Sequence, residues 1–134
     1  MTNMEMVGVA ALLLRLSLGV MFFAHAWVKI AVFTPAGTVK FFESLSLPGW
    51  FAYATIAAEV TGGALLILGI ETRWVALLLV PLILGTIVLV HGKNGWAFTN
   101  KDGGWEYPAF WAVGLLVLAL LGDGSAALGP MMGL

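Results

Sequence analysis

Long apolar stretches dominate this chain and constrain its fold more than any other feature. There are four of them, covering approximately residues 6–30, 50–70, 74–90 and 108–121. A helix rises 1.5 Å per residue, so about 20 mostly apolar residues cross ~30 Å of hydrocarbon. The fourth stretch is short, but Trp105 and Tyr107 before it suit the membrane interface. The sequence predicts four membrane-spanning helices.

The composition agrees with a membrane protein. Of 134 residues, 61% are hydrophobic before the 17 glycines are counted, and 10% are charged. A soluble domain averages about 45–50% apolar residues with glycine included, and a chain this short cannot bury so large an excess. We expect one integral membrane domain spanning residues 1–134.

Charge and cysteine content exclude several classes of function. The net charge of −1 leaves no basic surface for the phosphates of nucleic acid, so no nucleic-acid partner is expected. The absence of cysteine excludes disulfides, thiolate metal sites and iron–sulfur clusters. No motif for binding a cofactor occurs either. Any electron chemistry therefore requires a bound cofactor or substrate.

The connections between the stretches are unequal, and both long ones are predicted on one side. Residues 31–49 contain Thr34-Pro35, a typical helix start, and predict a short amphipathic interfacial helix ending at Pro48-Gly49. Residues 91–107 carry turn signals at Asn94-Gly95 and Asp102-Gly103, which predict a small hairpin or lid. The predicted fold class is all-α: an antiparallel four-helix bundle in the membrane with this helix and a hairpin-like loop on one side.

Orientation and processing follow from the cations and the first helix. The long-loop side carries four lysines against Arg73 on the other, which favours a cytoplasmic location for the long loops. Ala24-His25-Ala26 resembles a signal-peptide cleavage site. No Lys or Arg precedes Arg15, however, so we interpret residues 1–30 as a retained helix.

Polar residues share one face on each of the first two predicted helices. At 100° per residue, one stripe of the first helix contains Arg15, Phe22, His25 and Lys29. A face of the second contains Thr55, Glu59, Gly62, Gly63 and Leu66. We expect a polar funnel with Arg15 and Glu59 at its floor, and with His25, His91 and Lys29 near its mouth. The glycines favour close helix packing, and with Gly114 they leave room for a homo-oligomer.

The cost of burying charge makes these residues informative. An Arg or Asp at the centre of a membrane helix costs ~2.5–3.5 kcal/mol, so such residues persist when paired or functional. Arg15 and Glu59 are expected to neutralise one another, either as a structural ion pair or within a functional cavity. His25 and His91 line that cavity or are satisfied by water and backbone. No metal site is predicted, because Glu59 lies about 9 Å from the histidine level by helix rise.

The combined pattern resembles the DoxX family of small four-helix membrane proteins. The matching segments are Arg15-Leu16-Ser17-Leu18-Gly19, Phe22-Phe23-Ala24-His25-Ala26 with Lys29, Phe41-Phe42, Leu47-Pro48, Glu59-Val60-Thr61-Gly62-Gly63, Leu68-Gly69 and Thr72-Arg73. His91-Gly92, Asn94-Gly95-Trp96 and Gly104-Trp105-Glu106-Tyr107-Pro108 resemble one bacterial branch. Ala26 departs from the glycine that family members often have. The resemblance implies a bacterial inner membrane location, an association with oxidoreductases, and polar cavity residues at Arg15, His25, Lys29 and Glu59, with His91 from the branch alone.

Two functions from different classes are consistent with these residues. The first is a membrane oxidoreductase component that binds a quinone or another lipophilic redox substrate, in a pocket ringed by aromatic residues, and works with a soluble or membrane redox partner. The ring consists of Phe22, Phe42, Trp96 and Trp105. The alternative is a non-enzymatic scaffold, small-molecule carrier or assembly factor, which the absence of any redox motif favours.

Overall fold

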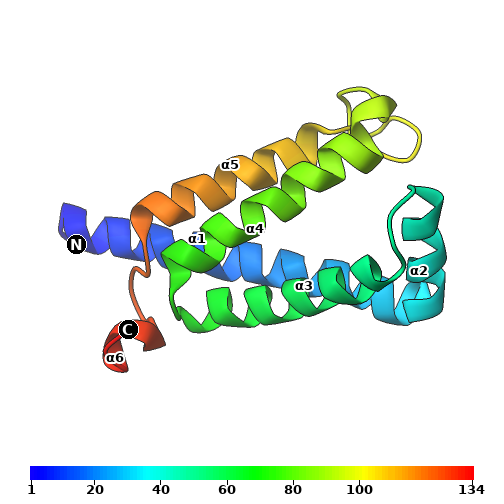
Figure 1. Cartoon of the computed structure of the whole chain (residues 1–134). Helices are drawn as coiled ribbons and strands as arrows, with labels where there is room; N and C mark the ends of the chain where they lie inside the picture. The colour runs from blue at the N-terminus through cyan, green and yellow to red at the C-terminus, as the bar shows by residue number, and fades with distance from the viewer.

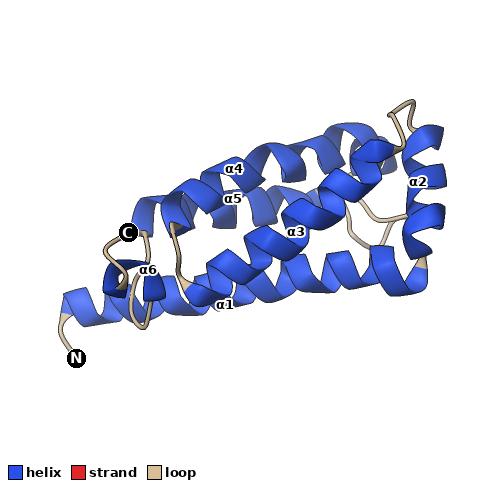
Figure 2. Ribbon diagram, turned by 60° about the horizontal axis from the view of Figure 1, so that its bottom comes forward, coloured by secondary structure: helices blue, strands red, loops and turns tan.

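The structure, a computed structural model, describes all residues 1–134 and contains helices and no strands (Figures 1 and 2). The elements are α1 (Asn3–Trp27), η1 (Val28–Val32), α2 (Thr34–Ser44), α3 (Trp50–Leu68), α4 (Thr72–Thr86), η2 (Ile87–His91), η3 (Gly92–Asn94), α5 (Glu106–Leu121) and α6 (Leu128–Met131). The turns η1 and η2 are π-helical and continue α1 and α4, whereas η3 is a 3₁₀ turn.

The long helices form a helical membrane bundle. Three continuous helical segments are long and apolar enough to cross a membrane: Asn3–Val32, Trp50–Leu68 and Thr72–Asn94. The fourth, α5, is apolar but has 16 residues. Helix α1 packs against α3 and α5, and α4 packs against the same two helices, which closes the bundle (Figure 1). Large apolar side chains such as Leu78, Phe110 and Leu120 remain exposed, as lipid contact requires.

Both long connections lie at one end of the bundle, as predicted, and both termini lie at the other (Figure 1). Helix α2 lies across the first of these ends and packs against α3 and η1 (Figure 2). Its start is set by Thr34, whose φ of 65° is unusual for a residue other than glycine and whose Oγ1 accepts from the Gly37 N–H at 3.2 Å. The predicted short helix is therefore confirmed, but it ends at Ser44 and not at Pro48-Gly49, which instead precedes α3.

The second long connection differs from a β-hairpin. Three backbone bonds join its arms, from Gly104 N to Ala97 O at 3.0 Å, from Trp105 N to Gly95 O at 2.9 Å and from Glu106 N to Trp96 O at 3.1 Å, but no strand forms. Gly95 and Gly103 have φ values of 81° and 78°, a region that glycine enters without steric cost. These reversals fold the segment into a compact loop rather than a ladder.

Glycines set the closest approach in the bundle. A Cβ on Gly63 would lie 3.0 Å from the Gly19 carbonyl oxygen, and a Cβ on Gly19 would lie 2.9 Å from that of Gly63. This confirms the predicted packing role of the α3 face, all of which is buried. Gly62 lies against Leu79 and Gly114 against Leu18. These glycines therefore face the interior of the bundle and not the outer surface that a second copy would use.

Candidate functional site

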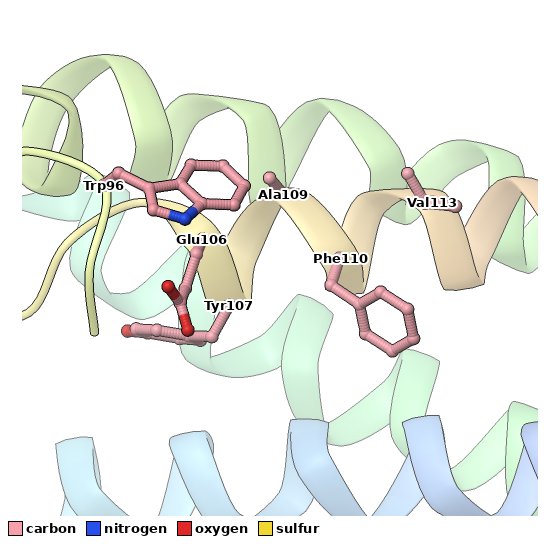
Figure 3. A pocket seen from close by; sticks show the side chains of 6 residues that line it. All are labelled: Trp96, Glu106, Tyr107, Ala109, Phe110 and Val113. Carbon is pink, nitrogen blue, oxygen red and sulfur yellow. The ribbon is translucent and has the colours of Figure 1, made fainter. Parts of the chain in front are cut away.

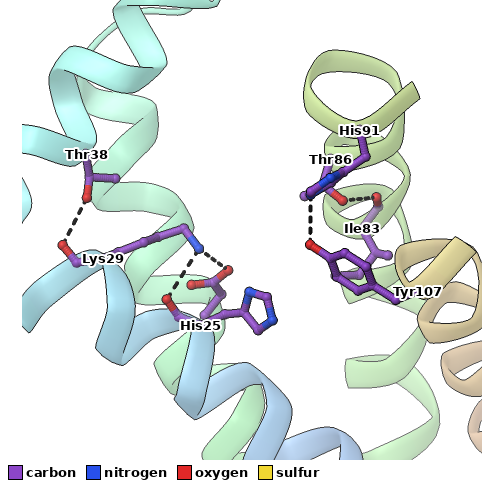
Figure 4. A network of polar contacts seen from close by, with 8 residues as sticks. His25, Lys29, Thr38, Ile83, Thr86, His91 and Tyr107 are labelled. Atoms are coloured by element: carbon purple, nitrogen blue, oxygen red, sulfur yellow. Dashed lines mark hydrogen bonds and ion pairs between the residues drawn. The ribbon is translucent and has the colours of Figure 1, made fainter. Parts of the chain in front are cut away.

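The buried ion pair joins Lys29 and Glu59, not Arg15 and Glu59 as the sequence suggested. Lys29 Nζ lies 2.9 Å from Glu59 Oε1, and it also approaches the His25 carbonyl oxygen at 3.5 Å. The Glu59 side chain is 6% exposed, so its charge is balanced within the protein. Lys29 lies in η1, directly after α1, and Thr38 Oγ1 donates to its carbonyl oxygen at 2.9 Å (Figure 4).

The register of α1 and α3 explains why Lys29 is the partner. Gly19 lies opposite Gly63, so in an antiparallel pair the level of Glu59 falls near Phe23. Arg15 and Lys29 lie on opposite sides of that level, by about 12 Å and 9 Å at 1.5 Å per residue. Helical side chains tilt toward their own N-terminus. The side chain of Lys29 therefore points toward Glu59, and that of Arg15 points away from it.

Arg15 instead fastens the C-terminal segment to the bundle. The residue is fully buried, and its guanidinium donates to the carbonyl oxygens of Leu66 (3.2 Å), Ile67 (2.9 Å), Ser125 (2.9 Å) and Ala126 (3.3 Å). Backbone bonds from Ser125 to Gly8 and from Gly129 to Gly69 complete the attachment. Arg15 therefore closes the end of the bundle opposite the long connections and does not contact Glu59.

A histidine and a tyrosine form a second polar contact on the other side of the bundle. His91 Nδ1 lies 2.9 Å from the Gly103 carbonyl oxygen, and Tyr107 Oη lies 2.8 Å from His91 Nε2. A carbonyl oxygen only accepts, so Nδ1 carries the proton and Nε2 accepts from the tyrosine hydroxyl. This pair links the end of α4 to the start of α5 (Figure 4).

His25 lies between the two polar contacts. Its ring centroid is 6.5 Å from that of Tyr107 and 4.7 Å from that of Trp111. In Figure 4 the imidazole extends from α1 toward the side on which Tyr107 and His91 lie. We call His25, Lys29, Glu59, His91 and Tyr107 the polar cluster. It combines groups from four helical segments at the end of the bundle that carries the long connections.

The aromatic residues predicted around the site occupy three places, and one of them, Phe42, lies on α2 with its ring 6.2 Å from that of Phe41. Phe22 is fully buried, and its ring lies 4.8 Å from that of Trp111. Trp96 and Trp105 pack edge to face at 4.5 Å within the second long connection, and both are exposed. Trp96 also lines an open surface groove of about 580 Å³ along α5 (Figure 3). The other lining residues are Glu106, Tyr107, Ala109, Phe110 and Val113.

Sequence reasoning missed two members of the interior. Tyr107 was predicted only as an interface anchor, and Trp111 was not singled out. They lie one helical turn apart on α5, and both contact His25. The spacing of four between two amphipathic aromatic residues was visible in the sequence and places them on one helix face. Which face they occupy depends on how α5 packs against α1. No three His, Asp or Glu side chains lie together as ligands for a metal ion.

Comparison with known proteins places this arrangement among related membrane proteins. A model of the DoxX family matches residues 10–92. The chain is 33% identical to "Putative oxidoreductase CatD" of Bacillus subtilis (strain 168), over 92% of this chain and 87% of that protein. It is 28% identical to inner membrane protein YqjF of Escherichia coli (strain K12), over 98% and 97% of the two chains. It is 32% identical to inner membrane protein YphA of the same strain, over 90% and 88%. No solved structure matches.

Proposed function

The chain belongs to the DoxX family of integral inner membrane proteins, and we propose that it is an oxidoreductase-associated protein that interacts with a quinone or a similar lipophilic redox substrate. The observation that carries the proposal is the polar cluster. Five ionisable side chains, arranged as the Lys29–Glu59 and His91–Tyr107 pairs with His25 between them, lie among helices that are otherwise apolar. Membrane helices retain such groups at a cost, and they mark substrate or proton pathways.

The polar cluster fits the proton requirement of quinone chemistry. Oxidation of a quinol to a quinone releases two electrons and two protons. His25 and Glu59 are placed to take up protons, and the His91–Tyr107 contact provides a further proton-carrying pair. The chain has no cysteine, so the two electrons pass to an acceptor held by a redox partner.

The groove along α5 offers a route from the lipid. Its lining is mostly apolar, and its volume falls within the ~300–1,000 Å³ of ligand-binding clefts. Tyr107 belongs both to this lining and to the polar cluster. A lipophilic ring that lies against Phe110 and Trp96 is therefore one side chain away from the groups that take up protons (Figure 3).

The test is to purify the protein in lipid nanodiscs, extract it for bound quinone, and measure quinol oxidation with an added electron acceptor. Glu59→Gln removes the buried carboxylate, and we expect it to lower turnover at least tenfold. Glu43→Gln is the matched control, because Glu43 is exposed on α2. The absence of bound quinone together with unchanged turnover in Glu59→Gln would overturn the proposal.

The second candidate is a non-enzymatic scaffold, carrier or assembly factor, favoured by the absence of cysteine and of redox motifs in the sequence. The two candidates differ in what a deletion does. If a partner complex is lost from the membrane while the purified protein has no turnover of its own, the scaffold is supported. If the purified protein turns over quinol without the partner complex, the scaffold function is excluded.

A further inference from the structure

We infer that Trp111 is the hydrogen-bond donor that holds an oxygen atom of the substrate inside the bundle, an inference that rests on the proposed function. Trp111 lies in the middle of α5 and is 3% exposed. Its Nε1 atom is buried and has no hydrogen-bond partner in the protein. An indole nitrogen can only donate, so the partner must be an acceptor.

The surroundings of Trp111 explain why the protein itself does not satisfy this donor. The indole ring packs against Phe22 at 4.8 Å and against His25 at 4.7 Å, both with tilted rings. Neither ring places an acceptor atom within hydrogen-bond distance of Nε1. A buried donor without a partner destabilises a fold, and phenylalanine would fill much of the same space without that cost. A tryptophan at this position is therefore explained by a ligand that accepts a hydrogen bond from Nε1.

A second unpartnered polar atom, of the opposite character, belongs to Glu59 of the polar cluster. Glu59 Oε2 is buried and accepts from no group in the protein, whereas Oε1 of the same carboxylate is held by Lys29. Lys29 Nζ also approaches the carbonyl oxygen of His25, whose ring contacts Trp111. The surroundings of His25 thus leave one donor and one acceptor unused. Two further buried polar atoms have no hydrogen-bond partner, Arg15 Nε and Thr72 Oγ1, and both belong to residues near the opposite end of the bundle.

A quinone and its quinol match this donor and acceptor. A quinone carries oxygens that only accept, so it can be held by the Trp111 N–H. A quinol carries hydroxyl groups, so it can also donate to Glu59 Oε2. Access passes Tyr107, which lies one helical turn before Trp111 and lines the groove on α5. The geometry points to Trp111 as the residue that positions the ring, with the free oxygen of Glu59 as the atom that receives a proton.

The experiment compares two ligands on two proteins. Binding of 1,4-naphthoquinone and of naphthalene, which has the same ring system without oxygens, is measured by calorimetry on wild type and Trp111→Phe in nanodiscs, with empty nanodiscs subtracted. We expect the Kd for naphthoquinone to rise about tenfold in Trp111→Phe, which corresponds to ~1.4 kcal/mol. We expect the Kd for naphthalene to stay unchanged. Trp74→Phe is the control, because Trp74 is exposed at the start of α4.

The outcomes separate the role of Trp111 from the proposed interaction with a quinone. An equal rise for both ligands would mean that Trp111 only packs, and it would overturn the inference. Equal binding of naphthoquinone by wild type and variant would also overturn it, since water then suffices as the partner of Nε1, while the proposed function would stand. A wild-type protein that is folded by circular dichroism but binds no naphthoquinone would overturn the proposed function itself. Thermal unfolding of Trp111→Phe shows whether the variant is folded enough for the comparison.

Discussion

Lys29 Nζ and Glu59 Oε1 are 2.9 Å apart, although 30 residues separate them in the chain. The two side chains approach from opposite directions, because each points toward the N-terminus of its own helix and the helices are antiparallel. Lys29 is 17% exposed and Glu59 is 6% exposed. The two partners therefore differ in how well each tolerates the loss of the other.

Removal of Lys29 and removal of Glu59 are expected to destabilise the protein by different amounts. Lys29→Met leaves a buried carboxylate without a counter-charge, and breaking a buried pair in this way costs about 3–5 kcal/mol. Glu59→Gln costs less, since the longer Lys29 side chain can reach toward the interface. Unfolding of both variants in detergent, monitored by circular dichroism, measures the difference. The double variant, with both Lys29→Met and Glu59→Gln, should be more stable than Lys29→Met alone. If its loss in the free energy of unfolding equals the sum of the two single losses, the pairing is contradicted.

Substitution of Arg15 is expected to release the C-terminal segment. Arg15→Leu removes all four bonds to carbonyl oxygens, including those to Ser125 and Ala126. We expect limited proteolysis after residue 122 to become at least tenfold faster, and the free energy of unfolding to fall by about 2–4 kcal/mol. Lys40→Leu, on the exposed surface of α2, is the control. Unchanged proteolysis in Arg15→Leu would show that the segment is held by its backbone bonds and by the bond from Thr72 N to Asp123 Oδ1.

Glycine substitutions test the helix contact directly. Gly63→Ala places a Cβ 3.0 Å from the Gly19 carbonyl oxygen and 3.2 Å from the Phe23 ring, so α1 and α3 must separate. We expect a loss of about 1–3 kcal/mol in the free energy of unfolding. Gly85→Ala is matched in chemistry, but its Cβ meets nothing within 4 Å, so it should be neutral or stabilising by up to about 1 kcal/mol. Equal effects of the two variants would argue against the contact.

The tautomer of His91 can be observed by ¹⁵N nuclear magnetic resonance of histidine-labelled protein in nanodiscs. We expect a protonated Nδ1, because the Gly103 carbonyl oxygen accepts from it, and an unprotonated Nε2 that accepts from Tyr107. In Tyr107→Phe the tautomer should be retained, while the Nε2 resonance should shift as its hydrogen bond is lost. A proton on Nε2 in wild type would rule out the arrangement.

Single cysteines can test the topology, since the chain has none of its own. Met4→Cys and Met132→Cys lie at the end with both termini, whereas Lys101→Cys lies in the second long connection (Figure 1). An impermeant maleimide added to intact cells should label the two terminal positions, if the lysine-rich long connections are cytoplasmic. Lys101→Cys should react only after the membrane is opened. Labelling of Lys101→Cys alone would reverse the orientation, and labelling of all three would contradict a membrane crossing by α5 between Lys101 and Met132.

Much of the fold could be predicted because it depends on local patterns. The apolar stretches follow from hydropathy, and the non-helical position of Pro48-Gly49 before α3 follows from turn chemistry. The buried face around Glu59 follows from helical periodicity. Even Pro81 lies inside α4, as membrane helices permit. These features do not require knowledge of how two helices are aligned.

The site was harder to predict because it depends on register and on side-chain direction. Helix rise alone placed Arg15 near Glu59, but the Gly19–Gly63 contact sets the offset between the helices, and the tilt of the side chains decides which cation reaches the carboxylate. The partners of Arg15 lie 110 and 111 residues later in the chain, in a segment that carries no periodic signal. Such contacts become visible only once the chain is folded.

The attachment of residues 125 and 126 to Arg15 has a consequence for biosynthesis. Arg15 lies on α1, and the carbonyl oxygens of Ser125 and Ala126 that accept from its Nη2 atom are synthesised 110 and 111 residues later. Until that segment has been made, Nη2 must be accommodated by the insertion machinery, by lipid headgroups or by water. Docking of residues 125 and 126, rather than insertion of any single helix, is therefore the step that completes the bundle.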